Sequence, residues 1–226
     1  MLFLVLGRGK TGSLVAQVAA ERGHGVRVVG EEENHHASAL TAPFLAGFDA
    51  VIDFTTPEAA VQNIRACLAN GARVVVGTTG WYDQLEHLRG ICERRQGALL
   101  YSTNFSIGVQ ALFRVARTLA EAAPGYTFSI TEMHHATKID APSGTALSLK
   151  RIMESAHPGL SVEITSKREG EVPGIHVVEA RSANDCIELK HEAHSRRGFA
   201  EGAVRAAEWI AGKAGCWDFQ EIVSSL

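Results

Sequence analysis

Residues 2–12, Leu2-Phe-Leu-Val-Leu-Gly-Arg-Gly-Lys-Thr-Gly12, carry the strongest structural signal in this sequence. The first five residues are continuously apolar, which is typical of a short strand buried on both faces. Glycines then follow in the order G-x-G-x-x-G, and residues 13–22 continue with a helical pattern. This strand, turn and helix predict a loop that presents backbone N–H groups and the positive end of a helix dipole to the pyrophosphate of a dinucleotide.

An acidic residue, Glu31, stands roughly 20 residues beyond this loop, at the end of a second predicted strand. Its carboxylate can accept hydrogen bonds from the ribose hydroxyls of an adenosine. The predicted cofactor-binding residues of this region are Gly7, Gly9, Lys10, Thr11, Gly12 and Glu31. A tight turn that binds nothing is the alternative interpretation. A P-loop is excluded, because Leu4 stands where that motif requires its first glycine.

The residues after Glu31 also bear on the choice of cofactor. The run Glu31-Glu-Glu33 has no lysine or arginine beside it in the sequence to meet the 2′-phosphate of NADPH. We therefore expect NADH and/or NADPH as the cofactor, with NADH favoured. The neighbouring His35 and His36 could weaken this preference.

Apolar runs alternate with helical patterns through the first part of the chain. Strands are predicted at residues 2–6, 26–29, 50–54, 74–77 and 98–101, and helices at 13–22, 57–70 and 82–95. This alternation predicts a Rossmann-type doubly wound parallel sheet with helices on both faces. The run Gly77-Thr-Thr-Gly80 follows the fourth strand, where such sheets bind ligands, and it suits a nicotinamide; an ordinary turn fits equally well.

The pattern changes after residue 104. Helices are predicted at residues 105–123 and 143–156, and strands at 126–133, 160–165, 175–181 and 186–192. Several strands with few helices predict a second, α+β domain with an open mixed sheet, one face of which is exposed. An amphipathic helix is predicted at residues 199–213.

The composition is that of a globular chain, since 46% of the 226 residues are hydrophobic and 21% are charged. A formal net charge of −3 gives no general attraction to nucleic acid or to an anionic membrane, so neither is an expected partner. The four cysteines are widely spaced and indicate free thiols in a reducing cytoplasm. The apolar N-terminal run is too short to span a membrane and lacks the flanks of a signal peptide.

The densest group of chemically active residues lies in Glu132-Met-His-His-Ala-Thr-Lys-Ile-Asp-Ala-Pro-Ser-Gly-Thr-Ala146. A predicted strand ends early in this run, a loop follows, and Ser143 is the expected N-cap of the next helix. A lysine, a histidine that can exchange protons and the free N–H groups of a helix start together predict a site for one or two carboxylates. The candidate substrate-site residues are His134, His135, Lys138, Gly144 and Thr145.

Two other interpretations of this loop stay open. The paired histidines could bind a metal ion together with Asp140, but no third ligand stands at a usual spacing. Lys138 would also repel a cation, so no metal is expected. The loop could instead be purely structural.

The same run, E-x-H-H-x-x-K-x-D-A-P-S-G-T-A, resembles the signature of the dihydrodipicolinate reductase family, also called 4-hydroxy-tetrahydrodipicolinate reductases. Further similarity spans nearly the whole chain, at residues 9–12, 53–58, 77–80, 104–108 and 197–204. The resemblance implies an NAD(P)H-dependent oxidoreductase that reduces a cyclic dicarboxylate to tetrahydrodipicolinate. That substrate forms from aspartate semialdehyde and pyruvate, on the route to diaminopimelate and lysine.

The resemblance also implies roles for individual residues. His134 matches the family's acid–base position and Lys138 its proton donor, so both are expected to be catalytic. Substrate contacts are implied at His135, Gly144 and Thr145. Cofactor contacts are implied at Gly77, Thr78, Thr79, Ser102, Thr103, Asn104 and Phe105.

The resemblance further implies how the chain is divided and assembled. A dinucleotide-binding domain of residues 1–104 is completed by residues 199–226, and residues 105–198 form a substrate-binding and oligomerisation domain. A homotetramer is implied. The chain departs from the family in its glycine loop, which reads Gly-Lys-Thr-Gly where Gly-Arg-Met-Gly is common. It also has Thr56 where some members carry an arginine linked to NADPH.

Two other functions are kept as alternatives. Another two-domain NAD(P)-dependent amino-acid dehydrogenase would share the architecture but lack a comparable His-His-x-x-Lys loop. A non-catalytic NAD(H)-sensing protein would be expected to carry a DNA-binding or partner-binding segment, and the sequence contains no recognisable one.

Overall fold

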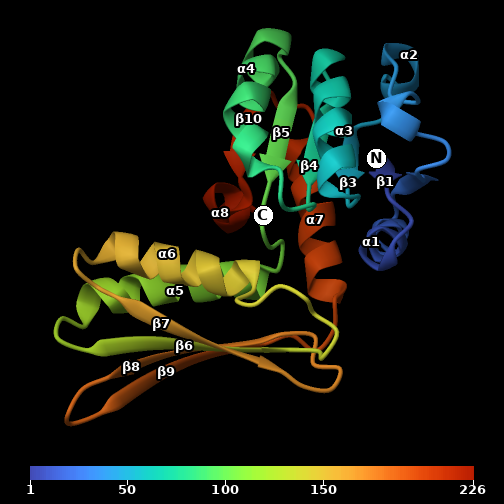
Figure 1. Cartoon of the computed structure of the whole chain (residues 1–226). Coiled ribbons are helices and arrows are strands. Elements are labelled where there is room, and N and C mark those ends of the chain that lie inside the picture. Colours follow the sequence, from blue (N-terminus) through green and yellow to red (C-terminus); the bar gives the residue numbers. More distant parts are fainter. The chain divides into compact units, whose positions relative to one another are not determined.

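The computed structural model describes all residues, 1–226, and they form two compact units. Unit 1 consists of Met1–Ser106 and Arg197–Leu226, and unit 2 consists of Ile107–Arg196. These bounds differ by two residues from the division expected from the sequence, at 104/105 and 198/199. Figure 1 shows the elements of both units.

Unit 1 is built on a six-stranded parallel sheet with the order β10-β5-β4-β3-β1-β2. Its strands are β1 (Leu2–Leu6), β2 (Gly25–Val29), β3 (Ala50–Asp53), β4 (Arg73–Val76), β5 (Ala98–Tyr101) and β10 (Gly215–Asp218). Its helices are α1 (Lys10–Glu21), α2 (Ala42–Leu45), α3 (Pro57–Ala69), α4 (Leu85–Arg95), α7 (Arg197–Ile210) and α8 (Phe219–Ile222). Short 3₁₀ turns lie at His35–Ala37, Tyr82–Gln84 and Val223–Ser225.

Alternate strand residues of this sheet enter two separate cores. Phe3 and Val5 of β1 pack against α1, α7 and α8, whereas Leu4 and Leu6 pack against α2, α3 and α4. Because both faces are covered, the central strands are apolar except at their ends, where β3 finishes with Asp53 and β4 starts with Arg73. The predicted doubly wound parallel sheet is confirmed.

The strand β10 was not predicted from the sequence. Its four residues are only partly buried and do not form an apolar run, so no local pattern marks them. They form a strand because Cys216 and Trp217 pair with Leu99 and Leu100 of β5, more than 100 residues earlier.

Unit 2 has a four-stranded mixed sheet with the order β7-β6-β8-β9. Its elements are α5 (Ile107–Ala122), β6 (Thr127–His134), α6 (Gly144–Ala156), β7 (Val162–Arg168), β8 (Ile175–Arg181) and β9 (Cys186–Glu192). The two helices pack on one face of the sheet (Figure 1), where Phe128, Ile130 and Val178 enter the core with Leu112 and Leu149. The alternating burial of β6 and β8 shows that the other face is left uncovered by this chain, as predicted for an open mixed sheet.

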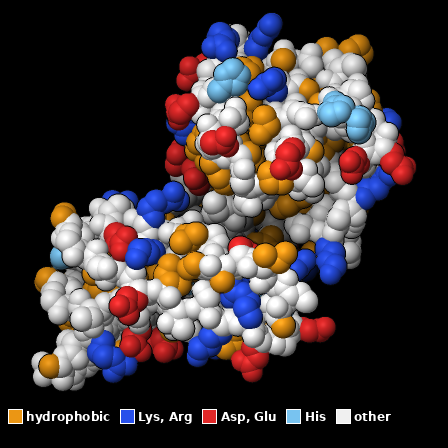
Figure 2. All heavy atoms as spheres, in the orientation of Figure 1, with side chains coloured by type: hydrophobic (Ala, Val, Ile, Leu, Met, Phe, Trp, Pro, Cys, Tyr) orange, Lys and Arg blue, Asp and Glu red, His pale blue; other side chains and the backbone are white.

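Charges of both signs are interspersed over the surface seen in Figure 2. This mixture agrees with the small net charge of −3 and leaves the capture of an anion to local groups. None of the helices combines the length and apolar character that a bilayer-spanning segment requires.

Candidate active site and cofactor pocket

The glycine loop between β1 and α1 is shaped by close backbone approaches. Gly7 has φ +104°, and a Cβ atom there would lie 2.3 Å from the carbonyl oxygen of Phe54. A Cβ atom on Gly12 would lie 2.2 Å from the carbonyl oxygen of Gly7. Both positions therefore exclude any side chain. Around Gly9, by contrast, the space is open, so its backbone is accessible to a ligand.

This loop forms one wall of a hollow of about 730 Å³, within the roughly 300–1,000 Å³ usual for small-molecule pockets. Gly7, Gly9 and Glu31, three of the predicted cofactor-binding residues, line it. Gly9 is the N-cap of α1, and no side chain caps the first-turn N–H groups of this helix. A pyrophosphate fits this uncapped helix start, which offers it hydrogen-bond donors and a positive dipole. Lys10, Thr11 and Gly12 form the first turn of the helix rather than the pocket wall.

One expectation about this pocket needs correction. The sequence shows no lysine or arginine beside the run 31–33, but the fold brings Arg8 to it. Arg8 Nη2 lies 2.8 Å from Glu33 Oε1, and Arg8 is the only lysine or arginine that lines the hollow. Residues 25 positions apart meet here because β1 and β2 are neighbouring parallel strands that end at the same sheet edge.

The run Gly77–Gly80 lies at the end of β4 beside a buried carboxylate, Asp53, at the end of β3. Thr78 Oγ1 donates to Asp53 Oδ1 at 2.9 Å, and Asn63 Nδ2 donates to Asp53 Oδ2 at 2.8 Å. Both the backbone N–H and the hydroxyl of Thr55 also donate to Asp53. Burial raises the pKa of Asp53, against the effect of these hydrogen bonds. The carboxylate thereby ties together two loops at the carboxyl edge of the sheet.

Residues 102–105, where cofactor contacts are expected, form a tight turn after β5. Ser102 Oγ donates to the carbonyl oxygen of Asn104 at 2.8 Å, and the backbone N–H of Ser106 donates to Asn104 Oδ1 at 2.8 Å. The Phe105 ring is buried in the core of unit 1 and lies 4.7 Å, centroid to centroid, from Phe219. None of the four lines the hollow at the glycine loop.

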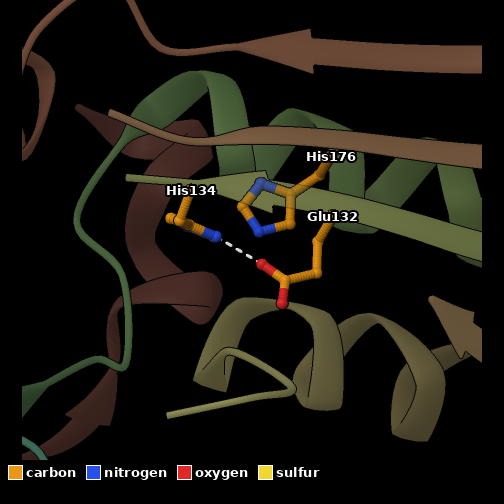
Figure 3. A group of neighbouring side chains, drawn as sticks. All are labelled: Glu132, His134 and His176. Carbon is orange, nitrogen blue, oxygen red and sulfur yellow. Dashed lines mark hydrogen bonds and ion pairs between the residues drawn. The ribbon is translucent and has the colours of Figure 1, made fainter. Parts of the chain in front are cut away.

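In unit 2, the strand β6 ends in a buried cluster of Glu132, His134 and His176 (Figure 3). Because side chains alternate along a strand, Glu132 and His134 point to the same face, and His176 is the register partner of Glu132 on β8. His134 Nδ1 is hydrogen-bonded to Glu132 Oε2. Arg168, the register partner of His134 on β7, places Nη2 2.9 Å from Glu132 Oε1.

The charges of this cluster fix the protonation of its members. Burial would raise the pKa of Glu132, but the hydrogen bond and charge of Arg168 are the main opposing influence, and the pKa is held at about 2. Burial, together with the charges of Lys138 and Arg168, lowers the pKa of His134 even though the Glu132 carboxylate raises it. Burial also lowers the pKa of His176 to about 4. At neutral pH both rings are therefore uncharged. An ionised Glu132 can only accept, so His134 Nδ1 carries the proton and Nε2 is left with its lone pair.

The start of α6 lies against this cluster. Ser143 is the N-cap, as predicted: its hydroxyl accepts from the Ala146 N–H at 3.2 Å and lies 3.3 Å from His176 Nε2. Gly144 has open space where a side chain would be, so its backbone is accessible. Thr145 is 8% exposed.

The loop before α6 holds the remaining candidate residues. Lys138 Nζ donates to Asp140 Oδ1 at 2.7 Å, and its charge helps to lower the pKa values of both His134 and His176. His135 is hydrogen-bonded to Thr137 instead and is not part of the buried cluster.

Three side chains in the cluster have the spacing of a metal site. The ligand atoms of Glu132, His134 and His176 all lie within 4.8 Å of one another. A divalent cation bound there would compete with Arg168 for the carboxylate and would face the charge of Lys138. Because these two fixed positive charges would repel the ion in a poorly solvated place, this donor set fits a metal poorly.

Sequence reasoning missed the partners of these side chains. Glu132 belongs to the run that points to the site, and its spacing of two from His134 in a strand was the available signal. Arg168 and His176 reach the cluster through strand pairing over more than 30 residues, which no local pattern reveals.

The chain matches the family models for dihydrodipicolinate reductase over both halves, the N-terminus at residues 1–105 and the C-terminus at residues 108–223. It is 36% identical to the 4-hydroxy-tetrahydrodipicolinate reductase of Christiangramia forsetii, with 100% of this chain and 99% of the relative covered. The protein of that name from Natronomonas pharaonis is 38% identical over 95% of this chain and 96% of its own length.

Solved structures share the fold. A dipicolinate-bound dihydrodipicolinate reductase from Paenisporosarcina sp. matches with a TM-score of 0.78 and 23% identity, covering 98% of this chain and 99% of its own. An aspartate dehydrogenase from Thermotoga maritima matches with a TM-score of 0.54 and 13% identity, covering 94% of this chain and 97% of its own. The two-domain plan is thus shared with amino-acid dehydrogenases, but the two matched family models and the identity of at least 36% to both relatives decide the assignment. The chain belongs to the dihydrodipicolinate reductase family.

Proposed function

We propose that this chain is a 4-hydroxy-tetrahydrodipicolinate reductase, which reduces a cyclic dicarboxylate to tetrahydrodipicolinate on the route to diaminopimelate and lysine. The observation that carries the proposal is the end of β6, where a carboxylate-held histidine lies beside a lysine and an accessible helix start. Family membership over both halves of the chain supports it. The dipicolinate bound to the Paenisporosarcina relative supports a dicarboxylate as the substrate class.

Unit 2 supplies the groups that handle the substrate. Lys138 and the first-turn N–H groups of Gly144 and Thr145 bind its carboxylates, because they combine a positive charge with hydrogen-bond donors at a helix N-terminus. His135 makes a further substrate contact. The Lys138 ammonium must exchange Asp140 for the substrate when it binds.

His134 and Lys138 carry out the proton chemistry. The hydroxyl of the substrate leaves as water, which gives a more unsaturated ring, and reduction then adds a hydride and a proton across one double bond of that ring. The free Nε2 of His134 is the acid–base atom, and Glu132 stabilises the ring whenever Nε2 is protonated. The Lys138 ammonium is the proton donor.

Unit 1 holds the cofactor, which supplies the hydride when bound. The uncapped start of α1 takes the pyrophosphate, and Glu31 accepts hydrogen bonds from the adenosine ribose, which favours NADH over NADPH. Further cofactor contacts are proposed at Gly77, Thr78, Thr79, Ser102, Thr103, Asn104 and Phe105. Since the Phe105 ring is buried in the core, that residue would contribute its backbone.

The chain assembles, in this proposal, into a homotetramer in the cytoplasm without a bound metal. The uncovered face of the unit 2 sheet supports self-association, because Met133, Ile175 and Val177 lie on it only half-buried. Size-exclusion chromatography with light scattering measures the assembly directly.

The function is tested by mixing purified protein with NADH and freshly generated substrate, and by following the absorbance of the reduced nicotinamide. Substrate-dependent oxidation of NADH is expected. The Lys138→Ala variant should lose turnover by roughly 100-fold while its Kd for NADH stays within about twofold. An amino-acid dehydrogenase would instead reduce NAD⁺ with an amino acid, and a non-catalytic sensor would bind NADH without oxidising it. Either result, or equal losses of turnover and cofactor binding in Lys138→Ala, would contradict the proposal.

A further inference from the structure

The cation that lines the cofactor pocket is already engaged by a carboxylate. Arg8 Nη2 lies 2.8 Å from Glu33 Oε1 and 2.7 Å from Glu33 Oε2, so one guanidinium nitrogen reaches both oxygens. No other lysine or arginine lines the hollow. Any group that needs a fixed positive charge in this pocket must therefore compete with Glu33.

The pair is held in place by the backbone at the end of β2. Glu33 Oε2 also accepts from the Gly30 N–H at 2.8 Å. The Arg8 side chain lies over Gly30, where a Cβ atom would be 3.1 Å from Nη1 and 3.2 Å from Cδ. A glycine at position 30 thus leaves room for Arg8 to reach Glu33. The Glu33 carboxylate and the backbone of Gly30, which follow β2, thus fix the position of the Arg8 guanidinium, which follows β1.

This position matters because NADPH differs from NADH by a 2′-phosphate on the adenosine ribose. A phosphate monoester carries about −1.5 to −2 charges near neutral pH and is met in proteins by arginine forks. In this pocket Glu33 neutralises Arg8, the one lysine or arginine of the lining. NADH, whose ribose hydroxyls need only hydrogen-bond acceptors, requires nothing from Arg8.

We propose that Glu33 is a specificity-determining residue that favours NADH by holding Arg8 away from the 2′-phosphate of NADPH. The inference rests on the proposed function and deepens its cofactor preference. Glu31 acts on the ribose directly, whereas Glu33 acts through the arginine it binds. Removing the Glu33 charge should free Arg8 and improve the binding of a 2′-phosphate, but only while Arg8 is present.

The test uses two nucleotide probes that need no catalysis, 5′-AMP and 2′,5′-ADP, titrated into the full chain by calorimetry at low ionic strength. In Glu33→Gln the Kd for 2′,5′-ADP should fall about fivefold, the range of an exposed ion pair, while that for 5′-AMP changes less than about twofold. Glutamine keeps an oxygen for the Gly30 N–H. In Arg8→Ala the Kd for 2′,5′-ADP should rise, and adding Glu33→Gln to it should give no gain.

The matched control is Glu32→Gln, which removes the same charge from the neighbouring residue of the pocket. It should change the Kd for 2′,5′-ADP less than about twofold, since Glu32 does not pair with Arg8. Equal gains in the two glutamine variants, no gain in Glu33→Gln, or a gain that persists without Arg8 would each overturn the inference. If neither probe binds the wild type, the hollow is not a nucleotide-binding site, and both the proposed cofactor site and this inference are wrong. A parallel fall in the ratio of kcat/KM for NADH over NADPH in Glu33→Gln would support it.

Discussion

Two fully buried carboxylates, Asp53 in unit 1 and Glu132 in unit 2, have opposite surroundings and opposite pKa shifts. Both side chains lie near the end of a strand, and both residues are 0% exposed. Asp53 is surrounded by neutral donors, the hydroxyls and amides of threonine and asparagine, and burial raises its pKa. Glu132 has Arg168 and His134 beside it, and its pKa is held at about 2.

The Asp53 carboxylate therefore has a structural role, whereas the Glu132 carboxylate controls the protonation of His134. Neutral donors satisfy the lone pairs of Asp53 and join two loops, but they supply no countercharge. A guanidinium keeps Glu132 ionised at any ordinary pH, so Glu132 can fix the tautomer of His134 and stabilise its charged form. We therefore expect changes of the Asp53 carboxylate to act mildly and changes of the Glu132 carboxylate to act strongly.

The largest effect is expected from His134→Gln, which removes the acid–base atom of the charged cluster. Turnover should fall roughly 10³-fold, or about 4 kcal/mol, because proton transfer loses its positioned group. The Kd for NADH, measured by fluorescence, should be unchanged, since the cofactor groups lie in unit 1. His87→Gln, an exposed histidine on α4, is the control and should keep full activity. A variant that retains more than a tenth of the turnover would contradict the role of His134.

The next effect is expected from Glu132→Gln. Arg168, which lies 2.9 Å from Glu132, would be left facing a neutral amide in a largely buried position. Breaking such a pair should lower the free energy of unfolding of unit 2 by about 3 kcal/mol. Urea unfolding followed by far-ultraviolet circular dichroism would measure this loss. Tryptophan fluorescence serves as an internal control, because all three tryptophans lie in unit 1.

A matched variant separates this effect from a general loss of charge. Glu179→Gln breaks an exposed pair with Arg181 in the same sheet, where the side chains are 33% and 58% exposed. It should cost less than about 1 kcal/mol. Equal losses in Glu132→Gln and Glu179→Gln would mean that burial of the Glu132 pair has no special weight.

The comparison also shows what could be predicted from the sequence. Strands β1 to β5 were located to within one or two residues, because a sheet covered on both faces requires continuous apolar runs. The Ser143 cap and the candidate residues His134 and Lys138 were readable from a local motif. Helix α1 starts at Lys10, three residues before the predicted start, since its N-cap is a glycine without a capping side chain.

What escaped prediction depends on pairing between distant segments. Strand β7 runs to Arg168 instead of ending at residue 165, because its register with β6 continues to His134. That same register brings Arg168 to Glu132. The meeting of Arg8 and Glu33 has the same origin, in the pairing of β1 with β2. Such contacts follow from the assembled sheet and from no local pattern.

The two carboxylates should also respond to pH with opposite signs. The pKa of Glu132 is lowered from 4.5 to about 2, so its stabilisation is complete above pH 4.5 and is lost as the pH falls towards 2. The pKa of Asp53 is raised from 3.8, so its contribution is complete below pH 3.8 and is lost as the pH rises through the higher folded-state value. The wild type's advantage over Glu132→Gln should therefore shrink in acid, and its advantage over Asp53→Asn should shrink towards neutral pH. Urea titrations at several pH values measure both differences in the free energy of unfolding. If both differences changed in the same direction with pH, at least one of the two pKa shifts would have the wrong sign.

The smallest effect is expected from Asp53→Asn, the same carboxylate-to-amide change made in unit 1. The new oxygen can still accept from Thr55 and Thr78, but the new amide nitrogen meets the Asn63 amide, which donates to Asp53 Oδ2 at 2.8 Å in the wild type. Asn63 can turn over and accept instead, yet its oxygen then leaves Asn34, which donates to it at 2.8 Å.

The mismatch can be passed from Asn63 to Asn34, which is the last side-chain amide of this series. If Asn34 also turns over, it gives up the 3.2 Å hydrogen bond that its oxygen accepts from the Ala39 N–H. One hydrogen bond is lost wherever the chain stops, which corresponds to about 1 kcal/mol in the free energy of unfolding of unit 1. The removal of a buried charge without a counterion offsets part of even that loss. Urea unfolding followed by tryptophan fluorescence gives the value directly. A loss as large as that of Glu132→Gln would show that the negative charge of Asp53 is itself required, and the distinction between the two carboxylates would fail.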